Sequence, residues 1–241
     1  MVLKGGVNLR LFFGSLRYSE GMDLDADPSA SRAIRSAIKC LFENRDFLFR
    51  LRELGVRELD PGQGPNKDTQ TTFRYKFGAW MGGVRHSTKI EVSFRERNKA
   101  DQVAVDAASE TVVERYLRPG EKLAVPHYER NSAVRQKVIA LADRATVQAR
   151  DVFDLHVLVP REGDDKLISF LASSIETGKL RTAYDRALEI TYSEYQGQVM
   201  EFLADDVRER YGSREVWDGL RLSAVALIET AIKNQETAAQ A

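Results

Sequence analysis

The chain of 241 residues has one cysteine, three histidines and no long run of apolar side chains. A single cysteine, Cys40, cannot form an internal disulfide, and the scattered histidines lack the spacing of a structural zinc site. The longest apolar runs fall far short of the roughly 20 residues that cross a bilayer, and no signal-peptide segment follows Met1. We therefore expect a soluble, cytoplasmic protein that has no membrane partner.

The sequence also lacks net charge, with 36 basic and 36 acidic side chains, which excludes a uniformly basic surface for nucleic acid or membrane. The two signs are unevenly distributed. Residues 164–241 carry 14 acidic and 9 basic side chains, whereas residues 130–150 carry five basic side chains and one acidic. Near the start, three cations precede an acidic cluster: Lys4, Arg10 and Arg17 are followed by Glu20, Asp23, Asp25 and Asp27. Such neighbours suit an anion held through a metal ion, and a solvated helix face with an acidic loop is the alternative.

The motifs of most familiar enzyme classes are missing. The sequence has no GxSxG nucleophile elbow and no Walker lysine loop. Gly62 and Gly64 begin like a dinucleotide-binding loop, but Pro65 follows and ends the pattern. The common hydrolase, P-loop and dinucleotide-binding classes are therefore excluded.

The hydrophobic pattern predicts a mixed first half and a helical second half. Strands are expected over 22–25, 72–77 and 88–94, with a hairpin-like pair over 111–116 and 123–128. Helices are expected over 7–13, 29–54, from 132 onwards, 151–158, 165–176, 193–210 and 213–234, with a break at Pro160 and Gly163. We predict two domains, an α/β core over 1–128 and a helical lobe over 129–241.

One constellation in the N-terminal region carries a chemical signal. The Gly5-Gly6 turn precedes a short helix, an Arg-x-Ser and acidic residues at alternate positions of a strand, Asp23 and Asp25. Alternate strand residues face the same way about 6.6–6.8 Å apart, so two carboxylates can converge on a pair of divalent ions. A glycine turn at a helix start leaves backbone N–H groups for phosphate oxygens. The arrangement suggests phosphoryl or nucleotidyl transfer, and an acidic turn beside a glycine-rich loop stays open.

Four sequence blocks resemble the AbiEii/AbiGii toxin family of nucleotidyltransferases. They are LKGGVNLRLFFGSLRYSEGMDLD at 3–25, KIEVSFRE at 89–96, QKVIALADR at 136–144 and ARDVFDL at 149–155. The resemblance implies a DNA-polymerase-β-like nucleotidyltransferase core with a helical C-terminal lobe, a nucleoside triphosphate as substrate and two Mg²⁺ ions. Similar toxins, the MenT type among them, add nucleotides to the 3′ end of tRNA. Their usual partner is an antitoxin, often with a winged-helix DNA-binding domain.

The resemblance also implies the roles of individual residues. The catalytic set is Asp23, Glu91, Lys137 and Asp154. The metal ligands are Asp23 and Glu91. Asp25 is a third candidate that matches no family position and could serve only if the ion moved by a full strand repeat. The nucleotide-binding set is Gly5, Gly6, Ser15, Arg17, Ser19 and Lys137. Structural ion pairs or RNA contacts are the alternatives for Arg144, Arg150 and Asp151. Ordinary strand-face acids, and a lysine that lies along its own helix, remain the alternatives for the carboxylates and for Lys137.

Two departures from the family pattern bear on activity. Gly21 stands where the family has the first Asp of an Asp-x-Asp pair, and the chain begins at the glycine turn, where relatives carry a preceding helical segment. Loss of one carboxylate from a two-metal clamp lowers the rate by orders of magnitude. We expect an attenuated toxin, an inactive relative, or a variant selected because active toxin kills its host. A silent binding module and an antibiotic-modifying nucleotidyltransferase are the alternative functions.

Overall fold

The computed structural model describes residues 1–159 and 164–240. Within these the chain forms two compact units. The sheet unit comprises Met1–Asn8, Ser19–Asn98 and Val103–His127, and the helical unit comprises Leu9–Tyr18, Lys99–Gln102 and the chain from Tyr128 onwards. The division expected at residue 128 stays a prediction. The break expected at Pro160 and Gly163 lies outside the described residues.

Within the described residues, the strands of the sheet unit form one mixed sheet. The strands are β1 (Val2–Lys4), β2 (Gly21–Asp25), β3 (Val56–Asp60), β4 (Lys67–Asp68), β5 (Thr72–Met81), β6 (Val84–Ser93), β7 (Val103–Ala107) and β8 (Ala124–Tyr128). Their order is β3-β5-β6-β2-β1-β8-β7, with β4 paired to β5. Strand β2 runs parallel to β6 and antiparallel to β1. The strand predicted over 22–25 therefore lies in the middle of the sheet.

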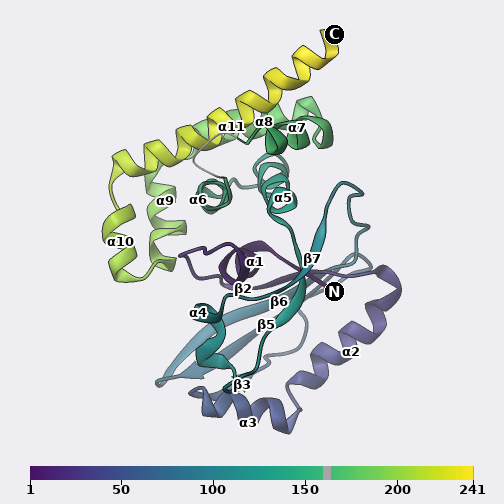
Figure 1. Cartoon of the computed structure of the whole chain (residues 1–241). Helices are drawn as coiled ribbons and strands as arrows, with labels where there is room; N and C mark the ends of the chain where they lie inside the picture. Colours follow the sequence, from purple (N-terminus) through teal and green to yellow (C-terminus); the bar gives the residue numbers. More distant parts are fainter. Residues whose placement is uncertain (160–163, 241) are drawn as a thin grey trace. The chain divides into compact units, whose positions relative to one another are not determined.

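One face of this sheet carries a small apolar core. Period-two alternation places Phe73 and Tyr75 of β5 and Val92 of β6 on that face, where they pack with Ile38 of α2 (Ser31–Leu41). Figure 1 shows α2 and α3 (Arg45–Glu53) alongside these strands. The residues between those positions point to the opposite face, and many of them are charged. The sheet thus has an apolar face and a polar one.

Two predictions for the sheet unit are wrong. The long helix over 29–54 is a 3-10 turn at Pro28–Ala30 followed by α2 and α3, because the Asn44 side chain accepts a hydrogen bond from the Phe47 N–H and starts a new helix. The strand over 111–116 is α4 (Glu110–Val113) and a second 3-10 turn, Glu114–Tyr116. Its run of β-branched residues favoured a strand, but β7 pairs with β8 instead.

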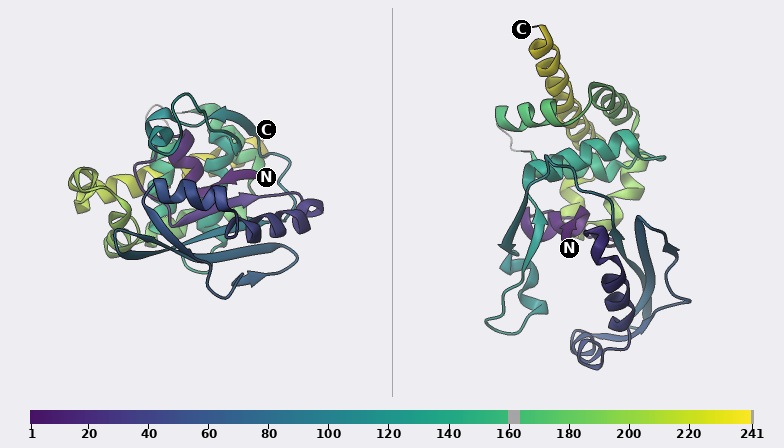
Figure 2. Two further views of the ribbon diagram at one scale, coloured as in Figure 1. Left: turned by 90° about the horizontal axis from the view of Figure 1, so that it is seen from below. Right: turned by 90° about the vertical axis from the view of Figure 1, so that its right-hand side faces the viewer.

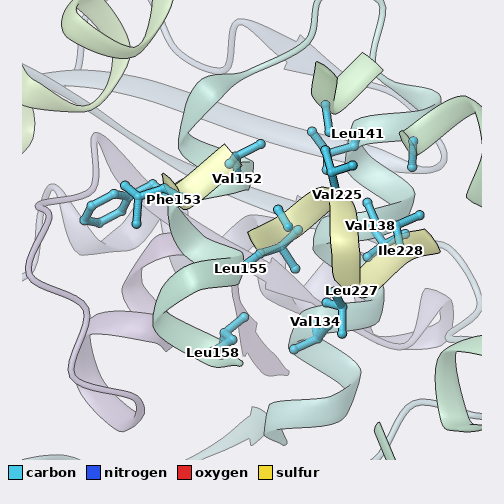
Figure 3. Packing of buried hydrophobic residues seen from close by; sticks show 14 of the residues in the cluster. Val134, Val138, Leu141, Val152, Phe153, Leu155, Leu158, Val225, Leu227 and Ile228 are labelled. Carbon is cyan, nitrogen blue, oxygen red and sulfur yellow. The ribbon is translucent and has the colours of Figure 1, made fainter. Parts of the chain in front are cut away.

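The helical unit is built around one large apolar core. Its helices are the second half of α1 (Gly5–Phe12), then α5 (Arg130–Asp143), α6 (Ala149–Leu158), α7 (Asp165–Ser174), α8 (Thr177–Glu189), α9 (Tyr192–Gln198), α10 (Asp205–Tyr211) and α11 (Arg214–Gln240). Figure 3 shows Val134 and Val138 of α5, Leu155 of α6 and Ile228 of α11 gathered in this core. The last turns of α11 extend beyond the helices it packs against (Figure 2).

The predicted number of helices after residue 165 is also wrong. Three were expected, and the described residues contain five. Helix α8 was missed, and the helix over 193–210 is divided into α9, a 3-10 turn at Met200–Phe202 and α10. A capping box between Thr191 and Glu194 starts α9. The predicted class, an α/β core with a helical C-terminal lobe, is confirmed. No helix among the described residues is long and apolar enough to span a membrane.

Candidate functional site

A row of charged side chains crosses the polar face of the sheet unit. Lys4 of β1 is the register partner of Asp23 of β2, Asp23 is the partner of Glu91 of β6, and Glu91 is the partner of Arg74 of β5. Residues that pair across adjacent strands share one face, so the four side chains form a line across β1, β2, β6 and β5. We call these four residues the charged row. The predicted catalytic acids Asp23 and Glu91 are its two central members.

The glycine turn lies directly against the first of these acids. Gly5 has a φ of +67°, a conformation that side-chain-bearing residues rarely adopt, and a Cβ at this position would lie 2.8 Å from Asp23 Oδ2. Gly6 follows as the second residue of α1. The turn predicted to cradle phosphate therefore packs on the Asp23 carboxylate, and only glycine at position 5 permits that approach.

A lysine next to the charged row was not among the predicted site residues. Lys89 Nζ lies 3.6 Å from Asp23 Oδ1 and 3.6 Å from Glu91 Oε2. Arg74 Nε donates a short hydrogen bond to Glu91 Oε2. Burial raises the pKa of Glu91, but the Arg74 hydrogen bond and the charges of Lys89, Arg74 and Lys4 outweigh it and hold that pKa below its ordinary value. Both central carboxylates thus have cationic partners.

The third predicted metal ligand has a partner of its own. Lys4 Nζ donates a hydrogen bond of 2.5 Å to Asp25 Oδ1. Within the described residues, no group of three or more His, Cys, Asp or Glu side chains is placed to hold a metal ion. Mg²⁺ requires octahedral oxygen ligands about 2.0–2.1 Å away. Two carboxylates bridged by an ammonium group, with Asp25 bound to Lys4, do not fit a clamp for two such ions.

Gly21 packs tightly against Lys89, and there is no space for a side chain at this position. Its register partner on β6 is Lys89. A Cβ at Gly21 would meet the Lys89 backbone carbonyl oxygen and would lie 2.5 Å from Lys89 Cγ. A backbone atom cannot give way as the end of a side chain can, so any other residue at position 21 requires β2 and β6 to shift. An aspartate at this position cannot simply be added to the present backbone.

Five more of the charged residues predicted for the site lie together in the helical unit. Arg17 donates two hydrogen bonds to Asp154, from Nε at 2.7 Å and from Nη2 at 2.6 Å. Lys137 Nζ lies 2.6 Å from Asp154 Oδ2 and donates to Asp151 Oδ1 at 2.8 Å. Arg144 Nε lies 2.9 Å from Asp151 Oδ2. We call these five residues the buried network, because both aspartates are fully buried and Arg17 and Lys137 are nearly so.

Helical spacing explains how the buried network forms. Asp151 and Asp154 are three residues apart on α6 and therefore share one face, which meets Lys137 of α5. Burial raises the pKa of Asp154, but the charges of Lys137 and Arg17 and their hydrogen bonds outweigh it and hold that pKa below its ordinary value. The Asp154 carboxylate therefore stays ionised although it is fully buried, because Lys137 and Arg17 lie against it.

Three further predicted site residues are Ser19, Ser15 and Arg150. Ser19 Oγ donates a 2.9 Å hydrogen bond to the Gly21 carbonyl oxygen. Ser15 is buried, and its Oγ has no hydrogen-bond partner among the described residues. Arg150 is half-buried at the start of α6 and has an interaction partner. Their functional roles stay predictions.

The basic stretch 130–150 is largely satisfied inside the helical unit. Arg130 donates to the Leu158 carbonyl oxygen at 2.9 Å, and Arg135, which is buried, lies 3.1 Å from Asp101. Lys137 and Arg144 belong to the buried network. The excess positive charge seen in the sequence is thus mostly matched by internal acceptors rather than displayed as a basic surface.

Sequence reasoning also missed a buried polar contact in the sheet unit. His127 of β8 is buried, with Nδ1 3.1 Å from Asn8 Oδ1 and Nε2 3.2 Å from Asp106 Oδ2. Nothing in the spacing of the three histidines pointed to this contact. For Lys89, a signal was available, because strand alternation places it on the same face as Glu91.

Comparison with known proteins identifies relatives of the chain. A family model described as nucleotidyl transferase AbiEii toxin, type IV TA system, matches residues 1–217. A crystal structure from H. pylori, provisionally described as a nucleotidyltransferase, covers 98% of this chain and 88% of its own at 18% identity, with a TM-score of 0.50. That of JHP933 from Helicobacter pylori covers 99% and 86% at 17% identity, with a TM-score of 0.49. No curated protein matches. At 18% identity, the similarity to the first of these two structures shows a shared fold and nothing more.

Proposed function

Because the chain belongs to the AbiEii nucleotidyltransferase toxin family of type IV toxin–antitoxin systems, we propose that it transfers a nucleotide from a nucleoside triphosphate to RNA at an attenuated rate. The acceptor in this proposal is the 3′ end of tRNA. Membership of the family implies an antitoxin partner, and we propose that this partner is a DNA-binding protein of the winged-helix type.

The observation that carries the proposal is the pair formed by Asp23 and Glu91. Two carboxylates face each other across parallel strands, and the Gly5 turn packs against one of them. A glycine turn of this kind can receive a phosphate through backbone N–H groups, and an adjacent carboxylate pair can act on the attacking hydroxyl. The Gly5 turn would thus receive the triphosphate, and the neighbouring Asp23 and Glu91 carboxylates would move the proton.

We expect a low transfer rate because of the residues around Asp23 and Glu91. Nucleotidyltransferases generally use a divalent metal ion, which stabilises the attacking and leaving oxygens. Here position 21 has no side chain, Asp25 is bound to Lys4, and the donor set does not fit two ions. We therefore assign no step to a two-ion clamp and expect transfer that is orders of magnitude slower than a complete site would give.

One observation favours a second function. This is a silent module with the nucleotidyltransferase fold, which binds nucleotide or antitoxin without turnover. Lys89 Nζ lies at the same distance from Asp23 and Glu91 and partners both carboxylates. If that ammonium group is not displaced when a nucleotide binds, the acids cannot take part in transfer. The two functions differ in one measurable property, the covalent labelling of RNA.

The test compares the wild-type chain with Asp23→Asn. Each is incubated at high concentration with total tRNA, magnesium and each labelled nucleoside triphosphate in turn. We expect slow labelling of tRNA by the wild type and a loss of about a hundredfold or more in Asp23→Asn. The matched control is Asp205→Asn, because Asp205 is an exposed acid on α10 paired only at the surface with Arg208, and it should label like the wild type. If the wild type labels no tRNA above background, transfer is refuted and the silent module remains. Labelling that is equal in the wild type and Asp23→Asn would refute transfer by the Asp23 and Glu91 pair.

A further inference from the structure

We propose that Lys89 is a built-in counter-ion of the charged row, holding the position between Asp23 and Glu91 that a divalent cation would otherwise take, and that Gly21 provides the space for it. This inference goes beyond the proposed function, because it concerns which cation the two carboxylates bind and does not depend on RNA as an acceptor.

The first argument is the symmetry of the contacts. Lys89 Nζ is 3.6 Å from an oxygen of each carboxylate, so a single ammonium group is shared between them. The side chains of Lys89, Asp23 and Glu91 are 26%, 31% and 25% exposed, respectively, so screening by water is incomplete. An ion that approaches both carboxylates must displace the ammonium group first.

The second argument is the fit between Gly21 and the lysine. The two residues are register partners, and a Cβ on residue 21 would lie 2.5 Å from Lys89 Cγ and would also meet its carbonyl oxygen. The stem of Lys89 therefore passes over the place where any side chain of residue 21 would begin. The absence of a side chain at residue 21 and the course of the Lys89 stem are therefore two parts of one packing arrangement.

The third argument is charge balance. The charged row together with Asp25 and Lys89 contains three carboxylates and three cations, the latter being Lys4, Arg74 and Lys89. These six groups are neutral as a set without any bound metal. A divalent ion would add positive charge to a set that is already neutral, whereas removing Lys89 leaves a net negative charge for the ion to neutralise.

The inference is tested by titrating the whole chain with Mn²⁺ alone and following free Mn²⁺ by electron paramagnetic resonance. The wild type should bind no Mn²⁺ in a manner that depends on Asp23. Lys89→Met keeps the length of the stem and removes the charge, and it should raise Mn²⁺ affinity about tenfold or more, because two partly exposed ion pairs are worth that much together. The double variant Lys89→Met/Asp23→Asn should lose this gain.

The matched control is Lys76→Met. Lys76 of β5 is the register partner of Lys89 on its other side and is exposed, so its removal reports the general effect of one fewer cation nearby. Its Mn²⁺ affinity should stay within about twofold of the wild type. Mn²⁺ binding by the wild type that Asp23→Asn abolishes would overturn the inference, and this comparison holds even if Lys89→Met fails to fold. Persistence of the Lys89→Met gain in the double variant would also overturn it.

Discussion

The charged row and the buried network use the same kinds of side chain in different surroundings. In the sheet unit, the carboxylates of the charged row are a quarter to a third exposed and share their cations with neighbours on the sheet face. In the helical unit, Asp151 and Asp154 are completely buried, Lys137 contacts both of them, and Arg17 pairs with Asp154. A partly exposed ion pair contributes little to stability and exchanges partners easily, whereas a buried one cannot lose a member without leaving a bare charge.

This difference separates residues that sequence patterns treat alike. The family resemblance places Arg17, Lys137 and Asp154 in the nucleotide site together with Asp23 and Glu91. Burial divides them, because the first three already satisfy one another inside the helical unit and the last two lie on an accessible sheet face. We infer that a substitution in the buried network acts first on folding, and one in the charged row acts first on binding.

The largest effect is expected for Asp154→Asn. This change leaves Arg17 and Lys137 with too few carboxylates in a buried position, and we expect the free energy of unfolding to fall by about 3–5 kcal/mol. Urea denaturation followed by circular dichroism measures it. Asp205→Asn is the control, because its surface pair with Arg208 should contribute less than about 0.5 kcal/mol. Equal losses in the two variants would remove the distinction between the clusters.

The next effect is expected for Gly21→Ala, which adds a Cβ without a carboxylate. The new atom meets the Lys89 backbone, so β2 and β6 must separate locally, and we expect a loss of about 1–3 kcal/mol. Gly219→Ala in α11 is the matched control, because a Cβ there meets no atom within 4 Å and alanine favours a helix. The urea concentration at the midpoint of unfolding, compared among the wild type and the two variants, measures this loss. A Gly21→Ala midpoint equal to that of the wild type would show that position 21 has room for a side chain.

Much of the fold was predictable because its elements follow local patterns. Alternation found β2, β5 and β6, and helical spacing found α5 and α6. The errors arose where a single contact overrides a pattern. Asn44 caps a new helix in the middle of an apolar helical run. Strand β8 pairs with β7 and not with the β-branched residues 111–113, which form a helix.

The site was predictable as a set of residue types and not as a set of contacts. The four sequence blocks named Asp23, Glu91 and Lys137, but no local rule says that Lys89 reaches both acids or that Asp151 and Asp154 hold Lys137. These contacts depend on strand register and on the packing of α5 against α6, which only the assembled units define. For Gly21, the family resemblance indicated a missing carboxylate, and the packing adds that the backbone leaves no space for one.

The smallest effect is expected in the pH dependence of stability, and it sharpens the comparison. The pKa values of Glu91 and Asp154 both lie below their ordinary values, 4.5 and 3.8, so each contributes stability that is fully present above that value and is lost as pH falls through its lowered pKa. Glu91→Gln should cost about 1 kcal/mol or less at pH 7, and this cost should begin to shrink as the pH falls below 4.5.

The cost of Asp154→Asn should begin to shrink only below pH 3.8, because the ordinary pKa of an aspartate is lower than that of a glutamate, and Lys137 and Arg17 lower the pKa of Asp154 further. Urea denaturation of the wild type and both variants at several pH values between 7 and 3 measures the two windows. If the two costs decline together over the same pH range, the two carboxylates share one kind of environment. The contrast between the partly exposed charged row and the buried network then does not hold.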